Sequence, residues 1–523
     1  MVWILAALAL SQTSHPHDAP PASTSILEVA QRPVSLRTGI GTAHDAVGTS
    51  SKNAQAFYDQ GLAYLHAYVW LEAARSFHQA LRSDPNLAIA HARLSLVYTE
   101  LNAPAAAREA LARARTLAAK ASPHDRRHVD LDVLRADAEA APQDAAKLAA
   151  YRSALDQALA AFPDDEELWL ARGQAESADP AERGQGSGSA SLRFYQKALT
   201  LAPGHLAAHH YLTHAYENLG RSDDALREGA AFANMAPGVP HARHMYGHNL
   251  RKVGRIDEAI AEFIAADGLE KAYFKTEGIP VEYDWHYQHN LDLLGTSFQY
   301  VGQMANAEAR LKASFAITSS LLQQEFNKRE WPAFLLARGR VKEALDAAAV
   351  MIAHRSPVIS AAGHVATGEA RLAQGDFKAA ADEANTALRL IRGVQAGGLV
   401  ATPLQALQGA FLLRTGQKEK GRSTIEDVVR KVRALPGPDN WTQALFTLER
   451  LARAARDAGE WDLAEWIAQQ MLQHDPNYAG THYALGLVAQ HKGDAAASRK
   501  AFDLAKQYWS KADAGLPELK QLR

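Results

Sequence analysis

From Ala54 onward, apolar residues recur with the three-to-four-residue spacing of amphipathic α-helices, and this pattern repeats about every 34 residues. In the first unit, small residues stand where two helices would approach each other, and a proline closes the second helix. Further units begin at Ala88, Leu206, Pro240 and Gln288. The pattern predicts an all-α chain of helix pairs in which neighbouring pairs cover one another's apolar faces.

Composition narrows the function classes. The formal charge is -2 and no stretch is strongly basic, so the sequence does not favour a nucleic acid or an anionic membrane as partner. We find no alternation of strands and helices, no glycine-rich phosphate loop and no nucleophile elbow, which argues against dinucleotide-binding, P-loop and α/β-hydrolase domains. The chain has no cysteine, so a transition-metal site would have to use His, Asp, Glu or water.

The first unit carries a recognisable set of residues, namely Phe57, Gly61, Tyr64, Ala73, Phe77, Ala80 and Pro85. This set resembles the tetratricopeptide repeat (TPR), and the resemblance covers nearly everything after Ala54. It implies a superhelical solenoid of about ten to eleven helix pairs. It also implies that the first helix of each pair lines a concave groove, where a protein or peptide partner binds.

The N-terminus begins with an apolar run from Val2 to Leu10, too short to span a bilayer and typical of a signal-peptide core, although basic residues before it are missing. A stray apolar N-terminus is the alternative. No other segment is long and apolar enough to cross a membrane, so we expect a periplasmic or secreted protein that is not an integral membrane protein. The expected parts are a signal peptide (1–23), a flexible leader (24–51), N-terminal TPR units (52–119), longer irregular helices (120–165), central TPR units with clustered histidines (166–320) and C-terminal TPR units (321–523).

Nine of the 22 histidines lie between His205 and His289, and several recur at matched places of successive units. His210 and His244 take the fifth place, His214 and His248 the ninth, His241 and His289 the second, and Glu217 the twelfth. At about 100° per residue, places two, five and nine form one stripe of a helix, apart from its packing positions. Histidines four residues apart can bind one metal, and this donor set suits a divalent transition metal such as zinc, copper or iron.

Other histidines receive different interpretations. We expect His209 to pack between helices and His286 to be a reserve ligand, while His205, just before a helix, is ambiguous. His124 and His128 stand in a charge-dense stretch that is typical of a solvated helix face. His66 falls at the thirteenth place of the first helix pair, and we expect it to lie far from the cluster along the array.

Two strings sharpen the resemblance: His209-His-Tyr-Leu-Thr-His-Ala-Tyr-Glu217 and His241-Ala-Arg-His-Met-Tyr-Gly-His248. They are similar to a group of exported bacterial TPR proteins in which His-His-Tyr-x-x-His-x-x-Glu and His-Met-x-x-His recur together. Tyr246-Gly247 departs from that group, which tends to have Pro-Ser there, and this puts the local backbone geometry in doubt.

Three functions stay open from the sequence. The first is a scaffold whose groove binds a protein or peptide and whose histidines hold a metal. The second is a metalloenzyme with an open coordination position, in which Glu217, if it is not a ligand, acts as general base. The third is a metal-free interaction module, whose histidines contact a peptide or an anion.

Overall fold

The computed structural model describes residues 25–177, 184–319, 321–435 and 438–522. The signal peptide expected over residues 1–23 lies outside the described residues. In these ranges the regular structure is α-helix, apart from short 3-10 turns and one isolated bridge between Thr42 and His205. The expected all-α fold of paired helices is confirmed.

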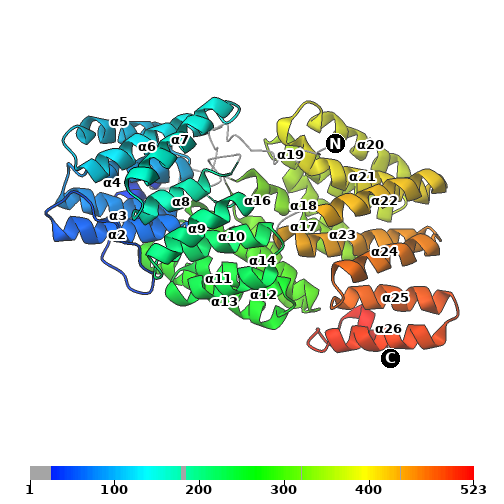
Figure 1. Cartoon of the computed structure of the whole chain (residues 1–523). Coiled ribbons are helices and arrows are strands. Elements are labelled where there is room, and N and C mark those ends of the chain that lie inside the picture. The colour runs from blue at the N-terminus through cyan, green and yellow to red at the C-terminus, as the bar shows by residue number, and fades with distance from the viewer. Residues whose placement is uncertain (1–24, 178–183, 320, 436–437, 523) are drawn as a thin grey trace. The chain divides into compact units, whose positions relative to one another are not determined.

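The chain divides into two compact units, and the boundary in the sequence lies between Asp284 and Trp285. The helices of the first unit are α1 (Ile26–Ala30), α2 (Lys52–His66), α3 (Trp70–Ser83), α4 (Ala88–Glu100), α5 (Pro104–Ala118), α6 (Pro123–Glu139), α7 (Ala145–Ala161), α8 (Glu166–Gln174), α9 (Ser189–Leu201), α10 (Leu206–Asn218), α11 (Ser222–Met235), α12 (Pro240–Lys252), α13 (Ile256–Glu277) and the 3-10 turn η2 (Val281–Tyr283). Their order along the chain can be followed in Figure 1.

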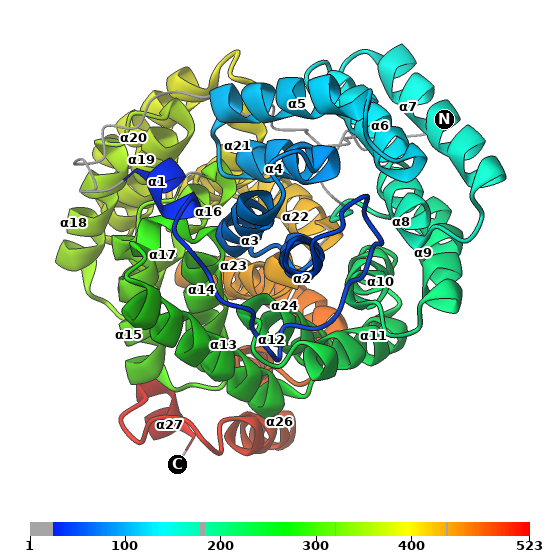
Figure 2. The same ribbon diagram turned by 90° about the vertical axis from the view of Figure 1, so that its left-hand side faces the viewer.

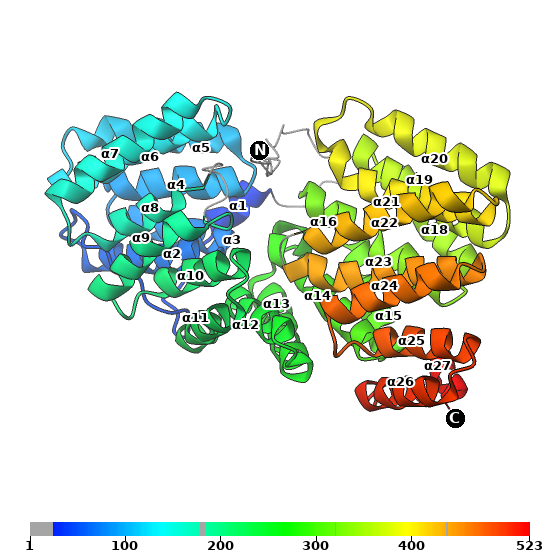
Figure 3. The same cartoon turned by 45° about the vertical axis from the view of Figure 1, so that its right-hand side comes forward.

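The helices of the second unit are α14 (Trp285–Tyr300), α15 (Met304–Ala316), α16 (Leu322–Asn327), α17 (Glu330–Ala337), α18 (Val341–Ile352), α19 (Pro357–Ala373), α20 (Phe377–Ile391), the 3-10 turn η3 (Gln395–Gly397), α21 (Gly398–Arg414), α22 (Lys418–Ala434), α23 (Pro438–Asp457), α24 (Trp461–His474), α25 (Ala479–His491), α26 (Ala495–Tyr508) and α27 (Pro517–Gln521). Figure 3 shows the later pairs of this unit stacked in sequence order, from α19/α20 to α25/α26.

Four helix pairs are closed by a glycine on the first helix and an aromatic ring on the second. Gly61 of α2 faces Phe77 of α3, and a Cβ atom at Gly61 would lie 2.6 Å from that ring. The same arrangement places a ring against Gly173, Gly247 and Gly486. Residues 120–163, which do not follow the repeat register, nevertheless also fold as a pair, α6 and α7. In these four pairs, the glycine at the eighth place of its unit therefore sets how closely the first and second helices pack.

The first unit curves until its beginning meets its middle. Helix α2 packs on α10, although about four helix pairs separate them along the chain. Figure 2 shows α2 beside α10, with α4 to α9 leading round from one to the other. This contact brings the end of α2 to the histidine-rich helices, and it positions the site described below.

Residues 25–51, for which a flexible leader is expected, run along the repeats. The backbone N–H of Gly238 donates to the carbonyl of Gly39 (2.7 Å), and that of Leu206 donates to the carbonyl of Thr42 (3.3 Å). The side chain of Gln60 on α2 donates to the carbonyl of Ser35 (3.1 Å). The leader therefore joins the starts of α10 and α12 to the first helix pair.

Among the described residues, the helices that are long enough to cross a membrane are too polar to do so.

The packing of Gly61 gives a test of the fold. We expect Gly61→Ala to lower the free energy of unfolding by about 1–3 kcal/mol, because the new methyl group overlaps the fully buried Phe77 ring. Gly188→Ala is the control, since a Cβ atom at Gly188 meets nothing within 4 Å. Urea unfolding followed by circular dichroism measures both. Equal stabilities of the two variants would contradict this account of the helix pair.

Candidate metal centre

Three of the histidines singled out by the sequence come together in the first unit. Nε2 of His210 lies 3.1 Å from Nε2 of His214 and 3.1 Å from Nε2 of His241. His210 and His214 are one turn apart on α10, and His241 is in the first turn of the neighbouring α12. We call these three residues the histidine triad. Their converging nitrogens make the triad a candidate for holding a metal ion.

The hydrogen bond on the far side of His210 decides which nitrogen is available. Nδ1 of His210 lies 2.6 Å from the backbone carbonyl oxygen of His66. A carbonyl oxygen can only accept, so Nδ1 carries the proton and Nε2 presents its lone pair to the other two imidazoles. A carbonyl on the outer nitrogen is the arrangement that commonly orients a histidine ligand toward a metal.

Two members of the triad, His210 and His214, are electrically neutral near pH 7. Burial lowers the pKa of His210 well below its usual value, and the like charge of His214 lowers it further. Burial also lowers the pKa of His214 to about 4. Only neutral imidazole binds a metal, so His210 and His214 are held in the form that binding requires.

The spacing of the nitrogens fits a shared ion. With metal–nitrogen bonds of about 2.0–2.1 Å and tetrahedral angles, two ligand nitrogens lie roughly 3.3 Å apart. The observed separations from His210 are close to this value. Three protein ligands would leave one position of a tetrahedral ion for water or another small ligand.

Aromatic rings enclose the triad. The Tyr68 ring centroid lies 4.5 Å from that of His210, 5.3 Å from that of His241 and 6.1 Å from that of His214. Phe232 stacks on His210 at 4.6 Å. Tyr68 is only 2% exposed and has a φ of 58°, an unusual conformation for a bulky residue. The sequence pattern gave no signal for Tyr68, because it belongs to the turn between α2 and α3.

The remaining predicted ligands lie elsewhere. On α12, His244 and His248 form a second pair, with ring centroids 4.4 Å apart. Oε1 of Glu217 is 3.8 Å from Nδ1 of His248 and accepts a hydrogen bond from the side chain of Asn249 (2.7 Å). His289 is half-buried on α14 in the second unit, so its role as a ligand stays a prediction from the sequence.

Three other histidines were given roles in advance. His209 packs against α11, where its Nδ1 is 2.7 Å from Oε2 of Glu228, in agreement with the expectation that it packs between helices. His205 is the N-cap of α10, and its Nδ1 accepts a hydrogen bond from the backbone N–H of Ala207. His286 is buried on α14, with its ring 6.4 Å from that of His289.

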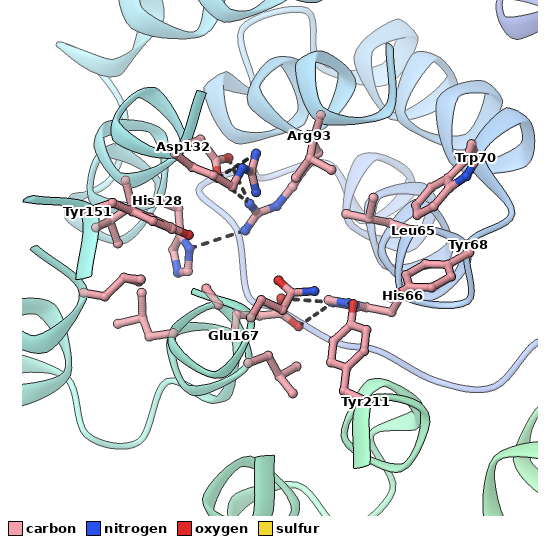
Figure 4. A pocket seen from close by; sticks show the side chains of 18 residues that line it. Leu65, His66, Tyr68, Trp70, Arg93, His128, Asp132, Tyr151, Glu167 and Tyr211 are labelled. Atoms are coloured by element: carbon pink, nitrogen blue, oxygen red, sulfur yellow. Dashed lines mark hydrogen bonds and ion pairs between the residues drawn. The ribbon is translucent and has the colours of Figure 1, made fainter. Parts of the chain in front are cut away.

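The expectation that His66 lies far from the cluster is wrong, because α2 packs on α10. Nδ1 of His66 is 2.8 Å from the hydroxyl of Tyr211, and its Nε2 is 3.1 Å from both carboxylate oxygens of Glu167. Nε2 of His205 is 2.9 Å from Oε1 of the same carboxylate. Figure 4 shows the chain of contacts from Tyr211 through His66 to Glu167.

His66, Glu167 and His205 also group closely enough to suggest a metal, but their hydrogen bonds indicate otherwise. Nδ1 of His205 accepts from the backbone, so its Nε2 carries the proton and donates to Glu167. Burial alone would raise the pKa of Glu167, yet the two imidazoles, above all His66, hold it well below its usual value. We interpret this group as a buried hydrogen-bond chain.

His124 and His128 are not on a solvated face, which corrects the interpretation made from the sequence. Nε2 of His124 is 2.8 Å from Asp45 of the leader, and Nε2 of His128 is 3.1 Å from Asp165 at the start of α8. Although burial disfavours a charge on His124, hydrogen bonds to Asp125 and Asp45 raise its pKa to about 10. The ring of His124 is therefore doubly protonated and charged near pH 7, whereas the rings of His210 and His214 are neutral.

A small cavity lies beside the triad. Its volume is about 40 Å³, enough for a few water molecules. Figure 4 shows Tyr68, His66 and Tyr211 on one side and Arg93, His128 and Tyr151 on the other. Tyr68 therefore separates this cavity from the triad.

No protein-family profile matches the sequence, and neither does any curated protein. Solved structures give distant likenesses. Among them, each at 12% identity, are yeast Tom70 (TM-score 0.32, covering 90% of this chain and 94% of that chain), the Cut9–Hcn1 hetero-tetramer of APC/C (0.28, 90% and 97%) and the human IFIT1 dimer with PPP-AAAA (0.36, 87% and 91%).

The tautomers assigned above can be measured. We expect His210 to be the Nδ1–H tautomer and His205 to be the Nε2–H tautomer near pH 7, because each outer nitrogen has a backbone partner of fixed role. Two-bond proton–nitrogen correlation spectra of histidine-labelled, chelator-treated protein distinguish the forms, with His210→Gln and His205→Gln assigning the signals. An Nε2–H proton on His210 would contradict the proposed orientation of its lone pair.

Proposed function

We propose that this helical-repeat protein binds a divalent transition-metal ion through His210, His214 and His241. The observation that supports this most is the convergence of the three Nε2 atoms. The hydrogen bond from Nδ1 of His210 to the His66 carbonyl directs the lone pair on Nε2 of His210 toward the other two rings. An all-nitrogen donor set of this kind suits zinc, copper or iron better than magnesium or calcium, which prefer oxygen ligands.

A metal-free explanation accounts less well for the triad. The single in-plane lone pair on Nε2 of His210 can accept one N–H directly, yet two imidazoles approach it equally closely. A role in contacting a peptide is also less suitable, since His210 has no exposed surface and lies beneath Tyr68. A cation satisfies all three nitrogens at once.

Elemental analysis of the full chain tests this proposal. We expect His210→Ala/His214→Ala to bind about one equivalent of metal less than the wild type, after both are loaded with zinc and freed of excess ion. His209→Ala is the matched control: this histidine is adjacent on the same helix but contacts Glu228. Inductively coupled plasma mass spectrometry gives the stoichiometry. The same metal content in all three proteins would refute the proposal.

An enzymatic role is the second candidate, and the observation that favours it is the number of ligands. A triad leaves a coordination position open, as catalytic zinc sites do, whereas structural sites are usually closed by four protein ligands. In that case the ion would activate a bound water or polarise a substrate oxygen.

An open position is detectable without knowing the reaction. We expect azide to change the visible absorption spectrum of the cobalt-loaded protein, because an exogenous ligand can replace the water. His210→Ala/His214→Ala should lose this response, and His209→Ala should keep it. A cobalt spectrum that azide leaves unchanged would favour a closed structural ion over an enzyme.

A protein or peptide partner and export to the periplasm are further parts of this proposal, supported by the repeat fold and by the apolar N-terminus. In the first unit the contact between α2 and α10 is made by the chain's own side chains, so a partner would bind another surface. Cross-linking in periplasmic extracts tests both: finding the protein only in the cytoplasm, or without a cross-linked partner, would count against them.

A further inference from the structure

The histidine pair on α12 repeats the design of the pair on α10. His244 and His248 are one turn apart, as His210 and His214 are, and their ring centroids are separated by 4.4 Å against 4.9 Å in the first pair. A ring nitrogen of His244 lies within 4.8 Å of one of His248. Both residues are at least 95% buried, with 1% and 4% of their surface exposed.

Each pair also rests on the phenylalanine of its own helix hairpin. Phe232 of α11 stacks on His210 at 4.6 Å, and Phe263 of α13 lies 5.5 Å from His244 and 6.1 Å from His248. In the second hairpin, Gly247 lets this ring approach, since a Cβ atom there would lie 2.7 Å from it. A phenylalanine of the following helix therefore contacts each pair, face to face with His210 in the first hairpin and edge to face with His244 and His248 in the second.

A carboxylate accompanies the second pair. Oε1 of Glu217 on α10 lies 3.8 Å from Nδ1 of His248, and Asn249 donates a hydrogen bond to the same oxygen. The side chains of Glu217 and His248 are 8% and 5% exposed. Two imidazoles and one carboxylate are a common donor set for zinc and for iron(II). A hydrogen bond that holds a ligating carboxylate is equally common around metals.

We propose that His244 and His248, with Glu217, bind a second divalent transition-metal ion next to the one held by the triad. This inference extends the proposed function, because it makes the centre binuclear. The two ions would be neighbours, since the rings of His241 and His244 stack with centroids 6.0 Å apart. Their surroundings differ: the first ion has nitrogen donors alone, and the second has a carboxylate beside two imidazoles.

Zinc stoichiometry of the full chain tests the second ion, with variants that address each set separately. We expect about two equivalents for the wild type and for His209→Ala, and about one for His244→Ala/His248→Ala and for His210→Ala/His214→Ala. Glu217→Gln should weaken the more labile equivalent by about 10–100-fold in a competition titration with a chromogenic chelator. His248→Gln keeps the size and polarity of the side chain and should also lose about one equivalent.

The outcomes separate this inference from the proposed function. One equivalent in the wild type, kept by His244→Ala/His248→Ala and lost by His210→Ala/His214→Ala, would overturn the second ion and leave the first. One equivalent in the wild type, with none left in either double variant, would mean a single ion shared by both sets and would also overturn the second ion. No metal in any protein would overturn both proposals. Retention of the first ion in the α12 variants serves as the check that they are folded.

Discussion

The candidate centre depends on one hydrogen bond, from Nδ1 of His210 to the carbonyl oxygen of His66. It fixes the tautomer of a fully buried imidazole, and thereby the direction in which a lone pair points. It also joins the last residue of α2 to the middle of α10, across residues that are far apart in the chain. The orientation of His210 therefore depends on the curvature of the first unit. The His66 carbonyl is in place only because α2 packs on α10.

Histidines of the first unit fall into different chemical classes according to which group faces their outer nitrogen. Where a carbonyl oxygen faces the outer nitrogen, as in His210, the inner nitrogen is unprotonated and presents a lone pair. Where a backbone N–H faces it, as in His205, the inner nitrogen is a donor and a carboxylate completes the group. Where a carboxylate faces each nitrogen, as in His124, the ring keeps two protons, which agrees with its raised pKa. Neighbouring clusters of the same residue type therefore differ in whether a proton or a metal would occupy them.

The sequence was sufficient for everything that depends on local periodicity. Paired helices, the glycine and ring between the helices of several pairs, and two histidine pairs four residues apart all follow from spacing within a repeat. It also placed His241 near His210, because successive repeats stack in register. The contacts of His66 and Tyr68 with His210 could not be predicted from the sequence, because they depend on how far the array curves over several repeats. Asp45 was missed for a related reason: it belongs to the leader, whose composition carries no helical period, and its carboxylate meets His124 only in the folded unit.

The packing of α2 on α10 has a consequence for how this fold can change in evolution. Repeat arrays usually gain or lose units with little penalty, since each unit contacts only its neighbours along the chain. Here the units between α3 and α9 act as a spacer of fixed length, because they determine whether the end of α2 meets α10. Duplicating or deleting any one of them would leave a stable array and yet separate His66 and Tyr68 from the histidines. Lineages that keep the histidine triad should therefore keep the number of repeats before it, while the repeats after it remain free to vary.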